Sequence, residues 1–373
     1  PIRRIEVSAR GHFGGSTLCA EDLGLPALGH LCPADYLQST LDTALINTPG
    51  LTPLFGAALE QLTVDEAAVR LRLAGSDRAA EISGRLVIAA DGSIIDLASA
   101  AKKARVKLPF AANDMIGLVS AGKSGLALIK KAVTGLKTGH HKMNKVTLYA
   151  PIPRPRKNVF CVCWNYVDHF EEGAKARPHV TELPKHPAFF TKQPLSVNSP
   201  YGEVPSHPGV TEKLDWEVEM AVVIGKPGRN IKETDAMKHI FGYMIANDVS
   251  AREVQRKHGQ QWFKGKSLDG HCPMGPWITT ADEVKNPQNL RITCRVNGVT
   301  KQDSNTSYMY FKIPRLLAEL SAGLTLESGD LFLTGTPAGV GHARNPPEFM
   351  KAGDILETEV EGLGLLRNKI GAK

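Results

Sequence analysis

The segment DWEVEMAVVIGK, residues 215–226, places two glutamates two positions apart at the start of an apolar run. Successive side chains of a β-strand point to opposite faces, so a strand here puts Glu217 and Glu219 side by side on one face. Two like charges this close repel each other and are costly to remove from water. A hard divalent cation between the carboxylates offsets both costs. The segment therefore predicts a strand that carries part of a metal site.

A third oxygen ligand is expected from the segment GYMIANDVSAREVQ, residues 242–255. Magnesium usually keeps several waters and binds only a few carboxylates, and Asp248 ends an apolar run, where an acid suits this role. Arg252 and Gln255 follow it as polar residues. The competing interpretation is a pair of surface acids with an aspartate that caps a helix. For an isolated Glu-x-Glu pattern, that interpretation is the more common outcome.

Short apolar runs separated by turn signals such as Asn297-Gly298 dominate the chain after residue 158, with a helix expected around 312–322. This pattern predicts an α+β fold with a mostly-β C-terminal domain, not a doubly wound sheet. In the first ninety residues, a helix is expected near 35–46 and strands within 66–75 and 84–92. The predicted division is an extra N-terminal segment (1–92), a small, mostly helical region (93–150) and a catalytic domain (151–373). The strand-like runs are VFCVCW (159–164), EMAVVIG (219–225), LRITCRVNG (290–298), DLFLTGT (330–336) and DILETEVEGLG (354–364).

The composition argues against a membrane-spanning protein and against a zinc site built from cysteines. Hydrophobic residues make up 42% of the 373 residues, and no run approaches the roughly 18 apolar residues of a membrane span. No secretory signal opens the chain, so a cytoplasmic protein without a membrane partner is expected. The cysteines have no Cys-x-x-Cys zinc spacing, which favours reduced structural thiols. They are Cys19, Cys32, Cys161, Cys163, Cys272 and Cys294.

The net charge of +7 is concentrated in one region. Residues 101–157 hold thirteen Lys and Arg against a single acid, Asp114. Aromatic residues are scarce there and no nucleic-acid motif accompanies the charge, so a nucleic-acid partner is not expected. A solvated face that steers small anions is the preferred interpretation.

The segment GLVSAGKS, residues 117–124, matches the pattern of a phosphate-binding loop, G-x-x-x-x-G-K-[ST]. Such a loop needs a buried strand before it and a helix after it, and the preceding PFAANDMI is no clear strand. Apolar residues at helical spacing run through the segment instead, from Met115 to Val133. A helix is therefore expected, and a nucleotide-binding or adaptor module remains the non-enzymatic alternative.

Five segments in order carry a resemblance to a known family. NYVDHFEE (165–172), DWEVEMAVVIGK (215–226), NDVSAREVQ (247–255), QWFKGKSLDGHCPMGP (261–276) and LTGTPAGVG (333–341) together resemble the fumarylacetoacetate hydrolase superfamily over about residues 93–373. RNPPEFMKAGD (344–354) is most similar to its domain-containing-protein-2 branch, the oxaloacetate tautomerase relatives. The resemblance implies a mixed β-roll core, a homodimer and a Mg²⁺ or Mn²⁺ site that would also accept Ca²⁺.

The resemblance also implies roles for individual residues. Glu217, Glu219 and Asp248 would bind the metal. Lys266 of the GKS segment would be a catalytic residue that faces the substrate. The residues implied to bind substrate are Lys192, Arg252, Gln255 and Thr336.

A histidine and a glutamate three positions later form a dyad in the hydrolases of this superfamily. Here they would be His169 and Glu172, which lie close together if they share a helical turn. The carboxylate would then orient the imidazole so that it takes a proton from water. The competing interpretation is that His169 caps a helix.

The predicted function is metal-dependent hydrolysis of a carbon–carbon bond in a small anionic diketo acid of the acylpyruvate or fumarylacetoacetate kind. A bound metal would stabilise the enolate that leaves. The alternative is an oxaloacetate tautomerase, or an oxo-acid decarboxylase or isomerase, at the same site. The same residues can serve either reaction.

The first ninety residues resemble an internal piece of ubiquinone-pathway flavin hydroxylases. The similar segments are RIEVSARGHFGGSTL (4–18), GLPALGHLCPA (24–34) and RLVIAADG (85–92). The G-x-G-x-x-G strand–turn–helix that holds FAD is absent from this sequence, so no flavin is expected.

Overall fold

The computed structural model describes residues 93–136, 141–142, 146–173, 182–259 and 261–372, and five earlier strands. The chain divides into two compact units, Pro1–Arg85 and Leu86–Lys373. In the first unit, antiparallel pairs join β1 (Arg4–Ser8) to β2 (Gly15–Cys19) and β3 (Leu59–Val64) to β4 (Val69–Leu73). The helix expected near 35–46 lies outside the described residues.

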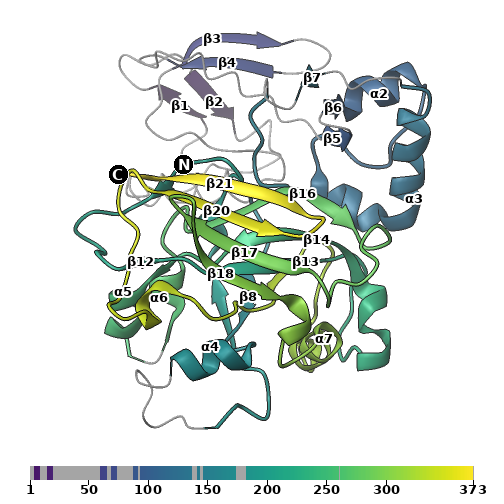
Figure 1. Ribbon diagram of the computed structural model, residues 1–373. Helices are drawn as coiled ribbons and strands as arrows, with labels where there is room; N and C mark the ends of the chain where they lie inside the picture. The colour runs from purple at the N-terminus through teal and green to yellow at the C-terminus, as the bar shows by residue number, and fades with distance from the viewer. Residues whose placement is uncertain are drawn as a thin grey trace. The chain divides into compact units, whose positions relative to one another are not determined.

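A seven-stranded mixed sheet forms the centre of the second unit (Figure 1). Its middle strands β14 and β13 pair antiparallel, and every residue of both is buried. This burial explains the continuous apolar runs in their sequences. In sheet order the strands are β10 (Val197–Asn198), β16 (Cys272–Thr280), β14 (Ile240–Asn247), β13 (Val218–Ile224), β19 (Leu331–Leu333), β8 (Val159–Val162) and β9 (Phe189–Lys192).

A five-stranded sheet lies against one face of the larger sheet. The hairpin between its strands β17 and β18 turns at Asn297 and Gly298, both with positive φ, as the sequence predicts for an Asn-Gly turn. In sheet order the strands are β11 (Val204–Pro205), β21 (Gly364–Gly371), β20 (Ile355–Val360), β17 (Arg291–Val296) and β18 (Val299–Asn305).

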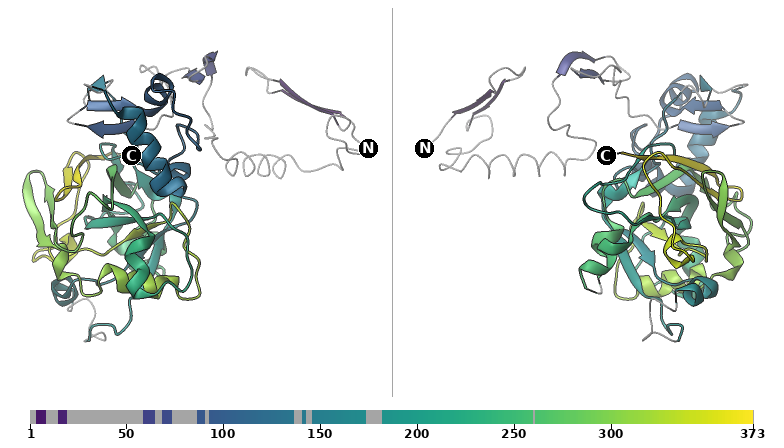
Figure 2. Two further views of the ribbon diagram at one scale, coloured as in Figure 1. Left: turned by 90° about the vertical axis from the view of Figure 1, so that its right-hand side faces the viewer. Right: turned by 60° about the vertical axis from the view of Figure 1, so that its left-hand side comes forward.

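Alternate residues of β13 divide between two cores. Even-numbered positions within Val218–Ile224 share a core with Ile292 and Leu356 of the five-stranded sheet. Ala221 and Val223, on the opposite face, share a second core with α2 (Leu97–Lys103) and α3 (Met115–Val133). Figure 2 shows these two helices next to each other in both views. The unit therefore has a layered α+β architecture, mostly β, as the sequence predicts.

The segment that matches a phosphate-binding loop lies inside α3. Asp114 caps this helix by accepting the Gly117 N–H at 2.8 Å, and the helix kinks at Gly122, where φ is +54°. Leu118, Val119 and Ile129 are buried, which confirms the predicted apolar face. Because a helix and not a strand leads into the segment, it lacks the strand–loop–helix geometry that cradles phosphate.

Shorter elements complete the second unit. Antiparallel pairs join β5 (Val87–Ala90) to β6 (Ser93–Asp96) and β6 to β7 (His141–Lys142), so the small region after residue 93 begins with a strand before its two helices. No helix in the described part of the chain is both long and apolar enough to cross a bilayer. The remaining elements are α4 (Val167–Glu172), β12 (Leu214–Asp215), β15 (Ser250–Ala251), α5 (Arg252–Lys257), α6 (Phe263–Lys266) and α7 (Ile313–Ser321), with 3₁₀ turns at 194–196, 233–239, 306–308 and 341–343.

Candidate active site

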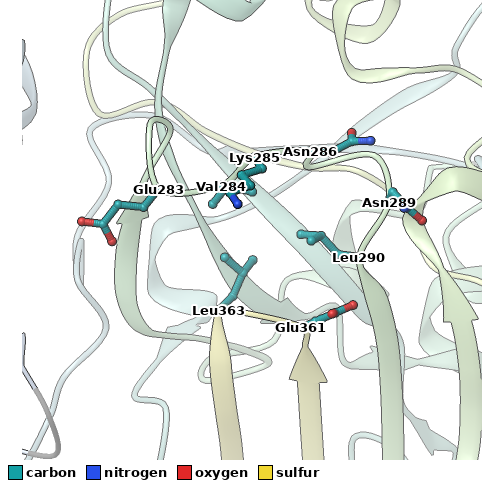
Figure 3. A pocket seen from close by; sticks show the side chains of 9 residues that line it. Glu283, Val284, Lys285, Asn286, Asn289, Leu290, Glu361 and Leu363 are labelled. Carbon is teal, nitrogen blue, oxygen red and sulfur yellow. The ribbon is translucent and has the colours of Figure 1, made fainter.

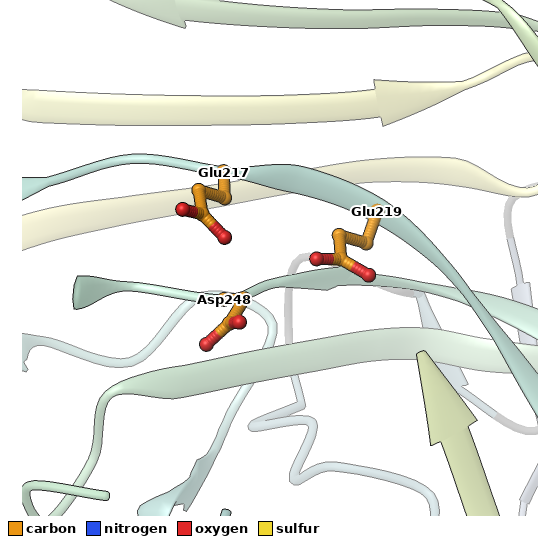
Figure 4. A group of neighbouring side chains, drawn as sticks. All are labelled: Glu217, Glu219 and Asp248. Atoms are coloured by element: carbon orange, nitrogen blue, oxygen red, sulfur yellow. The ribbon is translucent and has the colours of Figure 1, made fainter. Parts of the chain in front are cut away.

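Three buried carboxylates meet where β13 and β14 lie side by side. Glu217 directly precedes β13, Glu219 is the second residue of this strand, and Asp248 directly follows β14. The Asp248 N–H donates to the Glu217 carbonyl oxygen at 2.8 Å, which holds the aspartate beside the glutamates (Figure 4). Each side chain offers one oxygen, and these oxygens all lie within 4.8 Å of one another. These three residues are called the acidic cluster below.

Three buried cations surround the acidic cluster. Lys266 Nζ donates to Glu217 Oε2 at 2.6 Å and to Asp248 Oδ2 at 2.7 Å. Lys192 Nζ donates to Asp248 Oδ1 at 2.6 Å. Arg252 Nη2 lies 2.8 Å from Glu217 Oε1. Two of the three carboxylates are therefore ion-paired with residues of this chain.

The surroundings shift the pKa values of Glu217 and Glu219 in opposite directions. Burial alone would raise the pKa of Glu217, but Lys266 and Arg252 outweigh it and hold this pKa below its usual range. Burial raises the pKa of Glu219 well above its usual range, and the neighbouring carboxylates of Asp248 and Glu217 add to the increase. Glu219 is thus the carboxylate that most needs another positive charge.

The donor set fits a divalent cation. Within the described residues, the one hydrogen bond to the Glu219 side chain comes from the Gly335 N–H at 2.5 Å, and no cation pairs with it. With Asp215 included, four buried carboxylates face only three buried cations. Clustered carboxylate oxygens are the ligands that hard divalent ions prefer. The acidic cluster therefore has the chemistry and the charge deficit of a metal site.

The turn that carries the Gly335 N–H to Glu219 requires a glycine at this position. Its φ is +93°, and a Cβ added there would lie 2.7 Å from the Cβ of Asn165. Only glycine combines this conformation with so close an approach. The turn after β19 can therefore bring its N–H to the Glu219 carboxylate.

Lys192 lies at the site, but its contacts differ from the predicted substrate-facing role. Its fully buried ammonium donates to Asp248 Oδ1, to the Val249 carbonyl oxygen at 3.2 Å and to the Lys266 carbonyl oxygen. Three acceptors account for the three hydrogens of a lysine ammonium. This geometry assigns Lys192 to holding Asp248 and the Lys266 backbone in place.

The predicted histidine–glutamate pair is formed. His169 Nδ1 lies 2.8 Å from Glu172 Oε1 within α4, and the other carboxylate oxygen, Oε2, accepts the Gly339 N–H at 2.8 Å. Gly339 also accepts the Nε1–H of Trp216 at 3.1 Å through its carbonyl oxygen, and Trp216 directly precedes Glu217, so the pair lies near the acidic cluster. The helix-cap interpretation is wrong, because the N-cap of α4 is Tyr166 and the His169 ring bonds Glu172 instead.

The remaining predicted residues lie close to the same cluster. Asp215 Oδ2 accepts the Arg252 Nε–H at 2.7 Å, and Arg252 Nη1 donates to Gln255 Oε1 at 3.3 Å. Thr336 is buried in the turn after β19, where its hydroxyl oxygen accepts from Gln302 Nε2 at 2.8 Å. The structure thus groups all ten predicted site residues around the start of β13, the end of β14 and the loops beside them.

Sequence reasoning missed two residues of this group. Asp215 is fully buried and holds Arg252, and His342 Nδ1 lies 3.2 Å from Asp215 Oδ2. The signal for Asp215 was present, because it precedes Glu217 by two positions in the same segment and continues the alternation of acids. Nothing in the local pattern around His342 indicates its partner, which lies 127 residues away along the chain.

A separate hollow of about 270 Å³ lies at the loops before β17 and between β20 and β21 (Figure 3). Leu290 and Leu363 contribute apolar surface to it, while Glu283 and Glu361 are acidic. None of its lining residues belongs to the acidic cluster or to its ion pairs. The candidate active site is therefore defined by the buried charges and not by this hollow.

Known proteins are similar to this chain in sequence and in fold. The family model described as fumarylacetoacetate (FAA) hydrolase C-terminal matches residues 158–371. The chain is 41% identical over 289 residues to the oxaloacetate tautomerase YisK of Bacillus subtilis, covering 75% of this chain and 94% of that protein. It is 48% identical over 228 residues to the human mitochondrial oxaloacetate tautomerase FAHD2A, covering 61% and 70%. The solved fumarylacetoacetate hydrolase of Exiguobacterium antarcticum matches with a TM-score of 0.62 at 30% identity, covering 84% and 98%.

Proposed function

Since the chain belongs to the fumarylacetoacetate hydrolase family, we propose that it is an enzyme that interconverts the keto and enol forms of oxaloacetate or a closely similar oxo-acid. One structural observation carries the proposal. A buried acidic cluster with a deficit of positive charge lies close to an imidazole fixed by a carboxylate. The names of the similar proteins favour this reaction, the alternative at the sequence level, over the hydrolysis that the sequence placed first.

Glu217, Glu219 and Asp248 would hold the divalent ion, which we propose to be Mg²⁺ or Mn²⁺. A bound ion of this kind supplies Lewis acidity, which favours negative charge on an enolate oxygen. Lys192 contributes indirectly, because its hydrogen bond to Asp248 fixes the orientation of that carboxylate. The proposal thus names both the ligands and one of the residues that would orient them.

Keto–enol exchange also requires proton transfer at carbon and at oxygen. Glu172 accepts a hydrogen bond from Nδ1 of His169, so Nε2 is the ring atom that can take up or release a proton at the substrate. Arg252 and Lys266 are the cations available to bind the carboxylates of an oxo-diacid. Their own pairing with Glu217 fixes their positions before the substrate arrives.

Hydrolysis of an acylpyruvate is the second candidate. The observation that favours it is the same His169–Glu172 pair, because an imidazole oriented in this way can equally take a proton from water. Both reactions use a small anionic substrate, which the basic residues within 101–157 would attract. The homodimer and the cytoplasmic location also remain proposals.

A substrate panel tests the proposed function. We expect the wild-type protein with Mg²⁺ or Mn²⁺ to accelerate enol–keto exchange of oxaloacetate and to cleave acylpyruvates far more slowly. Comparing kcat/KM for the two substrates, each with and without EDTA, provides the measurement. Efficient acylpyruvate cleavage with no acceleration of enol–keto exchange would contradict the tautomerase proposal and support the hydrolase.

A further inference from the structure

Two carboxylate–imidazole pairs hold the same loop, residues 339–342. Glu172 bonds His169 Nδ1 through one oxygen and the Gly339 N–H through the other, at 2.8 Å each. Asp215 makes the same kind of contacts at the end of this loop, as Glu172 does at its start. Its Oδ2 lies 3.2 Å from His342 Nδ1, and its Oδ1 accepts the Gly341 N–H at 2.7 Å.

Several hydrogen bonds hold the Asp215–His342 pair in place. Asp215 is fully buried and also accepts the backbone N–H groups of Trp216 at 2.8 Å and His342 at 3.0 Å. A Cβ added at Gly341 would lie only 2.7 Å from Asp215 Oδ1, so the loop backbone packs directly against this carboxylate. These contacts fix the imidazole of His342 at the site instead of leaving it free on the surface.

Arg252 connects this pair to the acidic cluster. Its Nε–H donates to Asp215 Oδ2 at 2.7 Å, while Nη2 lies 2.8 Å from Glu217 Oε1. The guanidinium of Arg252 thus contacts both the carboxylate that holds His342 and the proposed metal ligand Glu217. The His342 side chain keeps 18% of its surface exposed, and its Nε2 makes no hydrogen bond with the residues that the structure describes.

We propose that His342 is a second proton-transfer residue of the reaction, held by Asp215 as His169 is held by Glu172. This inference rests on the proposed tautomerase function. Keto–enol exchange moves one proton at carbon and one at oxygen, and two oriented imidazoles can divide these two transfers between them.

One imidazole removes a proton from carbon and the other gives a proton to oxygen, so the tautomerisation is balanced in protons and electrons. In the keto-to-enol direction, Nε2 of neutral His342 takes a proton from carbon 3 of the substrate. The electron pair of the broken C–H bond forms the C2=C3 double bond, and the carbonyl π pair moves to the oxygen. The oxygen then takes a proton from the imidazolium of His169. Exchange with water returns each imidazole to its starting state.

The surroundings of His342 suit the role of the base. Burial and the nearby Arg252 lower the pKa of His342 below its usual range, against opposing effects of Asp215 and Glu217. This shift favours the neutral form of the imidazole. With its Nδ1–H directed to Asp215, the neutral ring leaves a lone pair on Nε2, which is the form that accepts a proton.

The test uses the metal-loaded full chain and oxaloacetate. We expect His342→Gln to lower kcat for enol–keto exchange by about 10²-fold, the scale of general acid–base catalysis. The KM and the Mn²⁺ affinity, measured by calorimetry, should stay close to those of the wild type. The matched control is His186→Gln, because His186 pairs with Glu319 on the surface at 3.1 Å and is 73% exposed. This control should keep the wild-type rate.

A second variant separates proton transfer from a structural role. His342→Ala should regain activity when imidazole is added, whereas His186→Ala should not respond. Full activity of both His342 variants, or a loss that imidazole does not restore, would overturn this inference while an active wild type upholds the proposed function. A wild-type protein that does not accelerate enol–keto exchange would overturn the proposed function and this inference with it.

Discussion

Substituting Glu217 with alanine is expected to abolish divalent-ion binding and to reduce turnover to the background rate. This carboxylate is one of three that converge at the proposed metal site, and the two that remain are too few to hold the ion well. Asp248 is already engaged by Lys192 and Lys266, and burial keeps the pKa of Glu219 high. Calorimetric titration with Mn²⁺ checks the loss of binding separately from activity.

The alanine variant is also expected to be less stable. Removing the carboxylate leaves Lys266 and Arg252 each without one of their buried partners, which typically costs about 3–5 kcal/mol for a broken buried ion pair. Glu217→Gln should therefore be measured beside it, because the amide oxygen still accepts from Lys266 while the charge is lost. Glu327→Gln is the control, since Glu327 pairs with Lys157 at 2.8 Å on the surface. Wild-type Mn²⁺ affinity in Glu217→Gln would contradict the assignment of this ligand.

Substituting His169 with alanine is expected to lower kcat by about 10²-fold or more while the metal stays bound. The imidazole is not one of the proposed ligands, so the acidic cluster and its ion pairs remain intact. Glu172→Gln should lose less, because Glu172 orients the ring and does not itself transfer the proton. Enol–keto exchange of oxaloacetate measured in parallel with Mn²⁺ titration provides the test.

Two outcomes would contradict this role of the dyad. Undiminished exchange in His169→Ala would show that the imidazole transfers no proton in this reaction. A loss of Mn²⁺ affinity equal to the loss of rate would show that the substitution disturbs the metal site instead. His186→Ala, on the surface, is the matched control and should keep both properties.

The acidic cluster could be predicted because its signals are local. Strand alternation puts Glu217 and Glu219 on one face, and Asp248 follows an apolar run that becomes β14. The spacing of His169 and Glu172 on one helical turn also needs no knowledge of the rest of the chain. Every strand-like run proposed after residue 158 contains a strand, because buried strands carry strong apolar patterns.

Other features depend on contacts between distant parts of the chain. The turn at Gly335 reaches Glu219, and the 339–342 loop reaches Asp215, more than one hundred residues away in each case. The resemblance places Lys192 at the substrate, but its three hydrogen bonds within the protein become visible only in the fold. The sequence favours hydrolysis over tautomerisation, although the same residues can serve both reactions. The similar proteins supply the preference for tautomerisation.

Solvent-deuterium exchange at carbon 3 of oxaloacetate, followed by NMR in D₂O, tests the central claim most directly. The proton is lost from this carbon in enolisation, so incorporation of deuterium reports the proposed step without depending on a later product. We predict that the metal-loaded protein accelerates incorporation well above the uncatalysed rate, that EDTA removes the acceleration and that no pyruvate accumulates beyond the protein-free control. Accelerated release of pyruvate without accelerated deuterium incorporation would contradict the account.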